Sequence, residues 1–274
     1  MTEARRTAGS GSAGIAAVER TVAIVEALVE SRDGALITEL ATQLAIDKST
    51  VLRIVSGLEH AGYVNRDART GTCHLTFKLI ALANRHAGFL EVHDLSLPTL
   101  NKLAATTGEL VELAVVDNGS MVFVAKVDGR SELSSLRVIS GVGQPVRLHT
   151  MSAGKVWLAS LPESEALALA VKQGLSPRTP HSITQVIQLR RGLAEVRKKG
   201  YAFNLEEDSL GVDAVAVPVH ARGAVVGAVV VAAPSSRVAR VRLEAMVPQV
   251  RAAGEELSQI WPIDRALKAQ MRNC

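Results

Sequence analysis

Hydroxyl and cationic side chains gather in residues 37–62 at spacings that suit contact with a nucleic acid. In the helix expected over residues 48–60, Ser49, Arg53 and Ser56 share one face, because an α-helix turns by about 100° per residue. Arginine can bind guanine or phosphate, and serine can bind bases or phosphates. The opposite face is apolar and holds Val51, Ile54, Val55 and Leu58. This pattern predicts a helix that packs by one face and presents the other to a DNA major groove.

The neighbouring segments favour a winged helix-turn-helix around that helix. A shorter helix is expected over residues 39–44 with Thr38 as its cap, and Asp47 is expected to cap the second helix. Two short strands at 63–66 and 73–75 flank a turn, which predicts a hairpin that brings Arg66 and Arg69 to phosphates or the minor groove. The alternatives are a helical hairpin inside a core and an ordinary hairpin with solvated arginines.

Composition permits this interpretation and limits others. A length of 274 residues suggests about two domains, and 47% hydrophobic residues can build their cores. The net charge of +4 permits a nucleic-acid partner without requiring one. Two distant cysteines, Cys73 and Cys274, indicate neither a disulfide framework nor a metal site. The cysteines therefore favour a cytoplasmic protein, and we expect no cofactor. We also expect no membrane span, since the apolar run at 224–234 is too short to cross a bilayer.

The remaining chain predicts an α+β sensor-type domain. A first helix is expected over 16–30 with an apolar stripe of Val18, Val22, Val25, Leu28 and Val29, and a helix over 77–89 links the two halves. Further helices are expected at 91–107, 152–161 (capped by Ser152), 163–172, 184–199 and about 236–260. Strands are expected at 110–116, 121–127, 136–139, 145–148, 201–204, 212–220 and 224–232. Strand hairpins surrounded by helices are typical of the α+β class.

Several fragments imitate enzyme motifs without completing them. Residues 153–156 are similar to a P-loop, but no Ser or Thr follows Lys155 and His149 stands where the first Gly belongs. Residues 141–146 lack the third Gly of a dinucleotide fingerprint. His149 is a structural hydrogen-bonding residue or, alternatively, a base. Glu206 and Glu207 could be paired carboxylates, or part of a loop that shapes a pocket.

Ordered motifs along the chain identify a family. They are VER at 18–20, TELA at 38–41, DKSTV at 47–51 with Arg53, LEHAGYV at 58–64, TGE at 107–109, LHTMSAGK at 148–155, RKKGYA at 197–202, EE at 206–207, GV at 211–212 and APSSR at 233–237. With them the chain resembles the IclR family of bacterial transcriptional regulators from Val18 to about Leu257. The resemblance implies an N-terminal winged helix-turn-helix, a C-terminal GAF-like α/β effector domain and no enzymatic activity. It also implies homodimers, often paired into homotetramers, on palindromic operators near catabolic operons.

The expected organisation follows from the motifs and the element pattern together. We predict a flexible tail at 1–14, a winged helix-turn-helix domain at 15–76 and a linker helix at 77–90. An effector-binding and oligomerisation domain at 91–262 and a C-terminal tail at 263–274 follow. The expected function is an effector-responsive regulator, a repressor rather than an activator. The alternative is an enzyme that acts on a small organic acid, with the winged domain as an accessory.

Site residues come from the resemblance and from the hairpin arginines. The DNA-binding candidates are Thr38, Lys48, Ser49, Thr50, Arg53, Arg66 and Arg69. The resemblance places the effector pocket at Val138, Met151, Ser152, Ala153, Asn204, Ala214, Val230 and Ala232. Relatives that bind small polar acids tend to have a carboxylate, hydroxyls or a thiol at the last four positions. Apolar walls leave such an acid without partners, so we expect an aromatic acid whose anionic end meets the helix at Ser152. Alternatively, Val230 and Ala232 are plain core residues.

Overall fold

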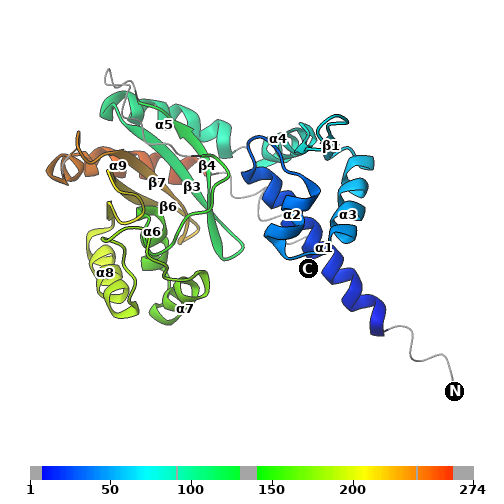
Figure 1. The fold of residues 1–274 in the computed structure, drawn as a ribbon. Helices are drawn as coiled ribbons and strands as arrows, with labels where there is room; N and C mark the ends of the chain where they lie inside the picture. The colour runs from blue at the N-terminus through cyan, green and yellow to red at the C-terminus, as the bar shows by residue number, and fades with distance from the viewer. Residues whose placement is uncertain (1–7, 91, 130–140, 239, 262–274) are drawn as a thin grey trace. The chain divides into compact units, whose positions relative to one another are not determined.

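The chain folds into two compact units, residues 1–88 and 89–274. The computed structural model (Figure 1) describes residues 8–90, 92–129, 141–238 and 240–261. The expected α+β class with two domains is confirmed. The division falls inside α4 (Lys78–Leu90), the helix expected to link the domains.

The N-terminal unit is a small helical core with a two-stranded hairpin. It contains α1 (Ala8–Glu30), α2 (Ile37–Leu44), α3 (Lys48–His60), β1 (Val64–Arg66) and β2 (Cys73–Leu75), and α4 follows. Fully buried side chains of all three first helices meet in this core, namely Ile24, Leu40, Val51 and Val55. The helix-turn-helix with its wing is therefore present as predicted.

The first helix differs from its prediction in length and in the face that packs. α1 begins at Ala8, not at residue 16. Its buried side is Ile24, Ala27 and Leu28, whereas Val18, Val22 and Val29, which the sequence places in the packed stripe, are exposed. α1 carries apolar residues on two faces, and periodicity alone cannot tell which of them packs within the chain.

The connection between α2 and α3 is tight and capped by side chains. Asp47 caps α3 as predicted, but Thr38 does not cap α2. α2 begins at Ile37 instead, and the Glu39 carboxylate accepts the backbone amide of Leu36 at 2.8 Å. Ala45 ends α2 in a left-handed conformation (φ 52°), which turns the chain directly into α3.

The C-terminal unit is built on one antiparallel sheet in the order β4-β3-β7-β6-β5. Its elements are α5 (Val92–Thr107), β3 (Leu110–Asp117), β4 (Ser120–Val127), α6 (Ser152–Ser160), α7 (Glu163–Gln173), α8 (Val186–Lys199), β5 (Ala202–Leu205), β6 (Val212–Ala221), β7 (Ala224–Pro234) and α9 (Arg240–Ile260). The strand expected at 136–139 lies outside the described residues. The strand expected at 145–148 is wrong, since Pro145 forms only an isolated bridge to Val122.

The two faces of this sheet differ in side-chain size along β6 and β7. Helices α5 and α9 cover the face whose strand residues include Val215, Val217, Val229 and Val231. Helix α6 packs on the other face, with α7 and α8 beside it, and there the strand residues include Ala214, Ala216, Ala228 and Ala232. Successive strand residues point to opposite faces, so the sequence alternates between the two sets. The alanine face leaves room beneath α6.

Candidate functional site

The first turn of α3 is fixed by its cap. The Asp47 carboxylate accepts the Ser49 hydroxyl at 2.6 Å and the Thr50 amide at 2.8 Å. The Ser49 and Thr50 hydrogen bonds hold the pKa of Asp47 well below its usual value. The cap therefore carries a negative charge at neutral pH, and the Ser49 hydroxyl keeps its lone pairs for a further donor.

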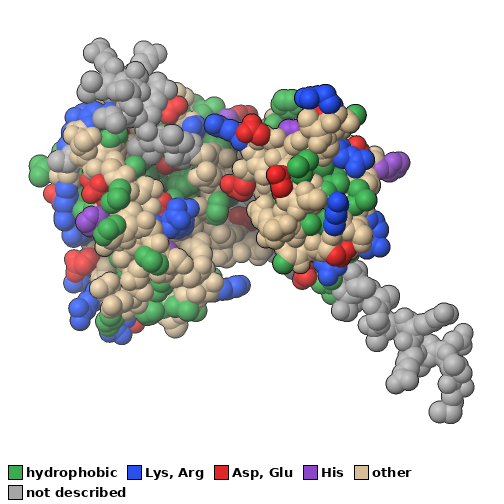
Figure 2. Space-filling model, in the orientation of Figure 1, with side chains coloured by type: hydrophobic (Ala, Val, Ile, Leu, Met, Phe, Trp, Pro, Cys, Tyr) green, Lys and Arg blue, Asp and Glu red, His purple; other side chains and the backbone are tan. Residues whose placement is uncertain are grey.

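The polar face of α3 is turned to solvent. Lys48, Ser49 and Arg53 are exposed and Thr50 is half-buried, while Val51 and Val55 are buried on the other side. Figure 2 shows Lys and Arg side chains on the visible surface of the N-terminal unit. The helix thus has the arrangement that docking in a major groove requires.

A hollow of about 420 Å³ brings together three of the predicted DNA-binding residues. Thr38 at the start of α2, Lys48 at the start of α3 and Arg66 in the wing line it together. Arg53 and Arg69 are not among its lining residues. Arg66 also lies 3.9 Å from the Glu59 carboxylate, and both side chains are more than a third exposed, so this ion pair is weak.

The wing turn is held by one carboxylate. Asp67 accepts the backbone amides of Arg69 and Thr70, both at 2.8 Å. The Thr70 amide and then the Arg69 amide keep the pKa of Asp67 below its usual value. The turn is therefore fixed while the Arg69 side chain stays exposed at its tip.

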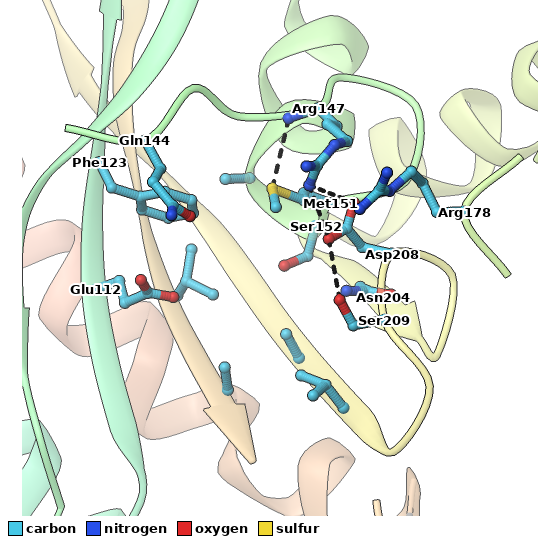
Figure 3. A pocket seen from close by; sticks show the side chains of 15 residues that line it. Glu112, Phe123, Gln144, Arg147, Met151, Ser152, Arg178, Asn204, Asp208 and Ser209 are labelled. Carbon is cyan, nitrogen blue, oxygen red and sulfur yellow. Dashed lines mark hydrogen bonds and ion pairs between the residues drawn. The ribbon is translucent and has the colours of Figure 1, made fainter. Parts of the chain in front are cut away.

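A second hollow, in the C-terminal unit, lies between the alanine face of the sheet and the start of α6. This pocket has a volume of about 430 Å³, within the range of small-molecule sites. Seven of the eight predicted effector residues line it, namely Met151, Ser152, Ala153, Asn204, Ala214, Val230 and Ala232. Val138 lies outside the described residues. Figure 3 shows the side chains that surround it.

The pocket also contains polar residues that the sequence did not lead us to expect. Glu112, Gln144, Arg147, Arg178, Asp208 and Ser209 line it beside the apolar Phe123 and Val212. The expectation of apolar walls therefore holds only for the floor on β6 and β7. These polar groups come from loops and from β3, far apart in the sequence. Only Glu112 leaves a signal, as a lone charge in the apolar run of residues 110–116.

One ion pair anchors a loop to the pocket wall. Arg147 Nη1 donates to both carboxylate oxygens of Asp208, at 3.0 and 3.1 Å. The Thr150 hydroxyl donates to the same carboxylate at 2.8 Å. The Arg178 side chain, by contrast, is exposed and makes no ion pair with any residue that the structure describes. Its guanidinium is accordingly available to a ligand anion at the pocket.

Two buried donors face the pocket. Ser152 and Asn204 are 2% and 5% exposed. The Asn204 Oδ1 accepts the Glu207 amide at 2.8 Å, and within the described ranges its Nδ2 has no hydrogen-bond partner. The prediction that Ser152 caps α6 is wrong, because the N-cap is Met151 and no side chain caps the helix. The Ser152 hydroxyl instead points into the pocket (Figure 3). Together with the first-turn amides of α6, these groups suit an anion.

The enzyme-like fragments have structural roles. Lys155 is 5% exposed and its ammonium binds the Glu207 carboxylate at 2.5 Å, so it cannot reach a nucleotide phosphate. Burial raises the pKa of Glu207 and lowers that of Lys155, and each partner's charge opposes the shift. Glu206 instead accepts the Gly211 amide at 2.6 Å, so the two glutamates are not paired. His149 Nε2 lies 3.1 Å from the Ser176 carbonyl oxygen.

The chain combines a winged helix-turn-helix domain with a domain that holds a small-molecule pocket. This combination defines a ligand-responsive DNA-binding regulator. Over the described ranges, no helix is long and apolar enough to cross a membrane. In the same residues, His, Cys, Asp and Glu do not gather in threes that could hold a metal ion.

Comparison with known proteins agrees with this class. Residues 17–68 match the IclR helix-turn-helix domain, and residues 86–259 match the bacterial transcriptional regulator IclR C-terminal domain. The HTH-type transcriptional repressor AllR of Klebsiella pneumoniae is 29% identical over 266 residues, which cover 94% of this chain and 96% of AllR. An IclR transcriptional regulator from Alicyclobacillus acidocaldarius has a TM-score of 0.76 at 27% identity, covering 89% of this chain and 97% of that one.

One further solved structure holds a ligand. It is an IclR homolog from Microbacterium hydrocarbonoxydans complexed with 4-hydroxybenzoate, with a TM-score of 0.73 at 22% identity. The match covers 89% of this chain and 98% of that chain, and at this identity it shows the fold alone.

The chain belongs to the IclR family of bacterial transcriptional regulators. The family consists of regulators and not of enzymes, so the alternative of an enzyme with an accessory winged domain is set aside.

Proposed function

We propose that this protein is an effector-responsive repressor of a catabolic operon that binds a palindromic operator. The observation that supports this best is the presence in one chain of an exposed cationic helix face and a pocket lined by two buried donors, Ser152 and Asn204, whose side-chain donors have no partner among the described residues. Effector binding would change which arrangement of the two units is populated, with α4 as the connection between them. The named relative AllR is a repressor, which favours repression over activation.

The DNA contacts are proposed at Thr38, Lys48, Ser49, Thr50, Arg53, Arg66 and Arg69. A gel-shift assay with the region upstream of the encoding gene tests this directly. We expect a shift at low salt that weakens as salt rises, because phosphate contacts release counter-ions. No shift at low salt would refute the regulator function.

The effector is proposed to be an aromatic acid or a close derivative. Its ring would lie on the apolar floor of Ala214, Val230 and Ala232, and its carboxylate would meet Ser152 and the start of α6. The 4-hydroxybenzoate bound by the Microbacterium homolog is a ligand of this class. Calorimetric titration with benzoates and with glyoxylate distinguishes the classes. Tight binding of glyoxylate alone would exclude an aromatic acid.

The protein is proposed to act as a homodimer or as a homotetramer of paired dimers. Support comes from α1, whose unpacked face carries an apolar seam with alternating spacings of three and four residues: Ile15, Val18, Val22, Val25 and Val29. Four of these side chains are at least 49% exposed, all but Val25. That spacing is the one by which two helices pack as a coiled coil, so we propose that a second copy covers the seam.

The oligomeric state of two matched variants tests the seam. Val22→Glu should dissociate the dimer in light scattering, because a charge would be buried between the helices. Val171→Glu, on an exposed position of α7, is the control and should leave the mass unchanged. An unchanged mass for Val22→Glu would exclude α1 as the interface.

A further inference from the structure

The pocket has two chemically different ends. Ser152, Asn204, Arg147 and Arg178 lie at one end, on the side of α6 and β5, and Figure 3 shows Glu112 on the other side, on β3. Phe123 and Gln144 line the pocket beside Glu112. The first end offers the donors of Ser152 and Asn204 and the guanidinium of Arg178, since Arg147 is paired with Asp208 there, whereas the second offers the carboxylate of Glu112. A ligand that fits must be matched at both ends.

The sheet fixes the separation of these ends. β3, which carries Glu112, and β5, which carries Asn204, are separated by β7 and β6. At about 4.8 Å per strand, the two backbones lie roughly 14 Å apart. Glu112 is paired in register with Val230, and Asn204 with Ala214, so both side chains stand on the pocket face. After the side chains reach inward, the span suits one aromatic ring with a hydrogen-bonding group at each end.

The Glu112 carboxylate is buried, so a ligand group that contacts it would do so in surroundings of low dielectric constant. Glu112 is only 4% exposed, and it lines the pocket. An ionised carboxylate is an acceptor only, with about four lone-pair sites, so it can accept a ligand donor in addition to its other contacts. A ligand acceptor or a second anion placed against it would be repelled in surroundings of low dielectric constant.

We propose that Glu112 selects effectors that carry a hydrogen-bond donor, such as a ring hydroxyl, at the end opposite the acid group. The effector class is thereby narrowed from aromatic acids to hydroxylated or amino-substituted aromatic acids. This inference rests on the proposed aromatic-acid function, and its test is arranged so that the two can fail separately.

The experiment is calorimetric titration of the full-length protein with four ligands that differ only at the far position. These are benzoate, 4-hydroxybenzoate, 4-methoxybenzoate and terephthalate. We expect 4-hydroxybenzoate to bind roughly 10- to 100-fold more tightly than benzoate, because its ring hydroxyl can donate a hydrogen bond to the Glu112 carboxylate. 4-Methoxybenzoate lacks the donor and terephthalate adds a negative charge, so both should bind more weakly than 4-hydroxybenzoate.

Two variants assign the selectivity to Glu112. Glu112→Gln should reduce the preference for 4-hydroxybenzoate over benzoate to a few-fold and improve binding of terephthalate, because glutamine can also donate. Arg178→Ala is the matched control: it should weaken all four ligands and leave the preference unchanged. The preference is a ratio measured within one variant, so it does not depend on a variant's overall stability.

Each outcome decides one of the two proposals. If the benzoates bind but Glu112→Gln leaves the preference unchanged, Glu112 is not the selector, and the aromatic-acid function stands. If none of the four ligands binds the unaltered protein, the aromatic-acid function is wrong and this inference falls with it.

Discussion

Gly154 lies where α6 packs against the segment that carries Arg147, and replacing it tests how the pocket is built. An added Cβ would stand 2.5 Å from the Leu148 Cα, 2.8 Å from the Leu148 carbonyl oxygen and 2.9 Å from the Arg147 carbonyl oxygen. All three atoms are backbone, so no side chain can rotate away. Gly154→Ala therefore forces α6 and residues 147–148 apart.

A matched glycine isolates the size of this effect. Gly192, inside α8, has nothing within 4 Å of an added Cβ. Both variants gain the helix propensity of alanine, about 1 kcal/mol, so that gain cancels in their comparison. The difference that remains is the overpacking cost at Gly154, about 1–3 kcal/mol. Gly192→Ala should be more stable than the unaltered protein, and Gly154→Ala less stable.

Urea unfolding of both variants measures this difference, and effector titration measures its consequence. Because the start of α6 presents Ser152 to the pocket, its displacement should weaken binding in Gly154→Ala and leave Gly192→Ala unaffected. If Gly154→Ala unfolds at the same urea concentration as Gly192→Ala, the close packing of α6 on residues 147–148 is refuted.

Three further results are expected. Arg53→Ala should weaken specific DNA binding by about 1–3 kcal/mol if Arg53 contacts a base, and an unchanged gel-shift affinity would remove it from the interface. Asp47 has a lowered pKa in the folded chain, so its cap stabilises above the ordinary value of 3.8 and that stabilisation is lost as the pH falls further. Urea unfolding of Asp47→Asn should accordingly show a flatter acid limb, and identical acid limbs would contradict the cap's charge. Lys155→Met leaves the Glu207 charge buried without its partner and should cost about 3–5 kcal/mol in thermal unfolding, more than the double variant Lys155→Met/Glu207→Leu. A double variant as unstable as the single one would argue against that account.

Local signals predicted the N-terminal unit well. The Asp47 cap, the apolar face of α3 and the hairpin after it depend on neighbours within a few residues, and the structure has all three. The packed face of α1 was predicted wrongly because Val18 and Val22 lie on an apolar face that the described residues of the unit leave exposed. The face by which a helix packs depends on tertiary contacts. The spacing of apolar residues in the sequence carries no information about those contacts.

The pocket was predicted only in its outline. Family motifs located Ser152 and Asn204, and seven of the eight residues proposed from them line one hollow. The motifs could not place Arg147 against Asp208, because that contact joins two loops 61 residues apart. They could not place Glu112 opposite Asn204 either, since this depends on the order of strands in the sheet. The positions of the charged residues at the ends of this pocket therefore depend on the order of the strands and on contacts between loops. The residues of its floor, by contrast, follow from the alternation of side chains along each strand.

The alternation of small and large residues in the sheet has a consequence for how this protein can change. Along β6 and β7, each alanine that lines the pocket has a strand neighbour in the separate core under α5 and α9: Val215 lies next to Ala214, and Val231 and Ala233 lie on either side of Ala232. A substitution at Ala214 or Ala232 alters the floor of the pocket and leaves that second core intact. Ligand preference can therefore change, one strand position at a time, without a change in the core under α5 and α9. A family built on this sheet can acquire new effectors without rebuilding its scaffold.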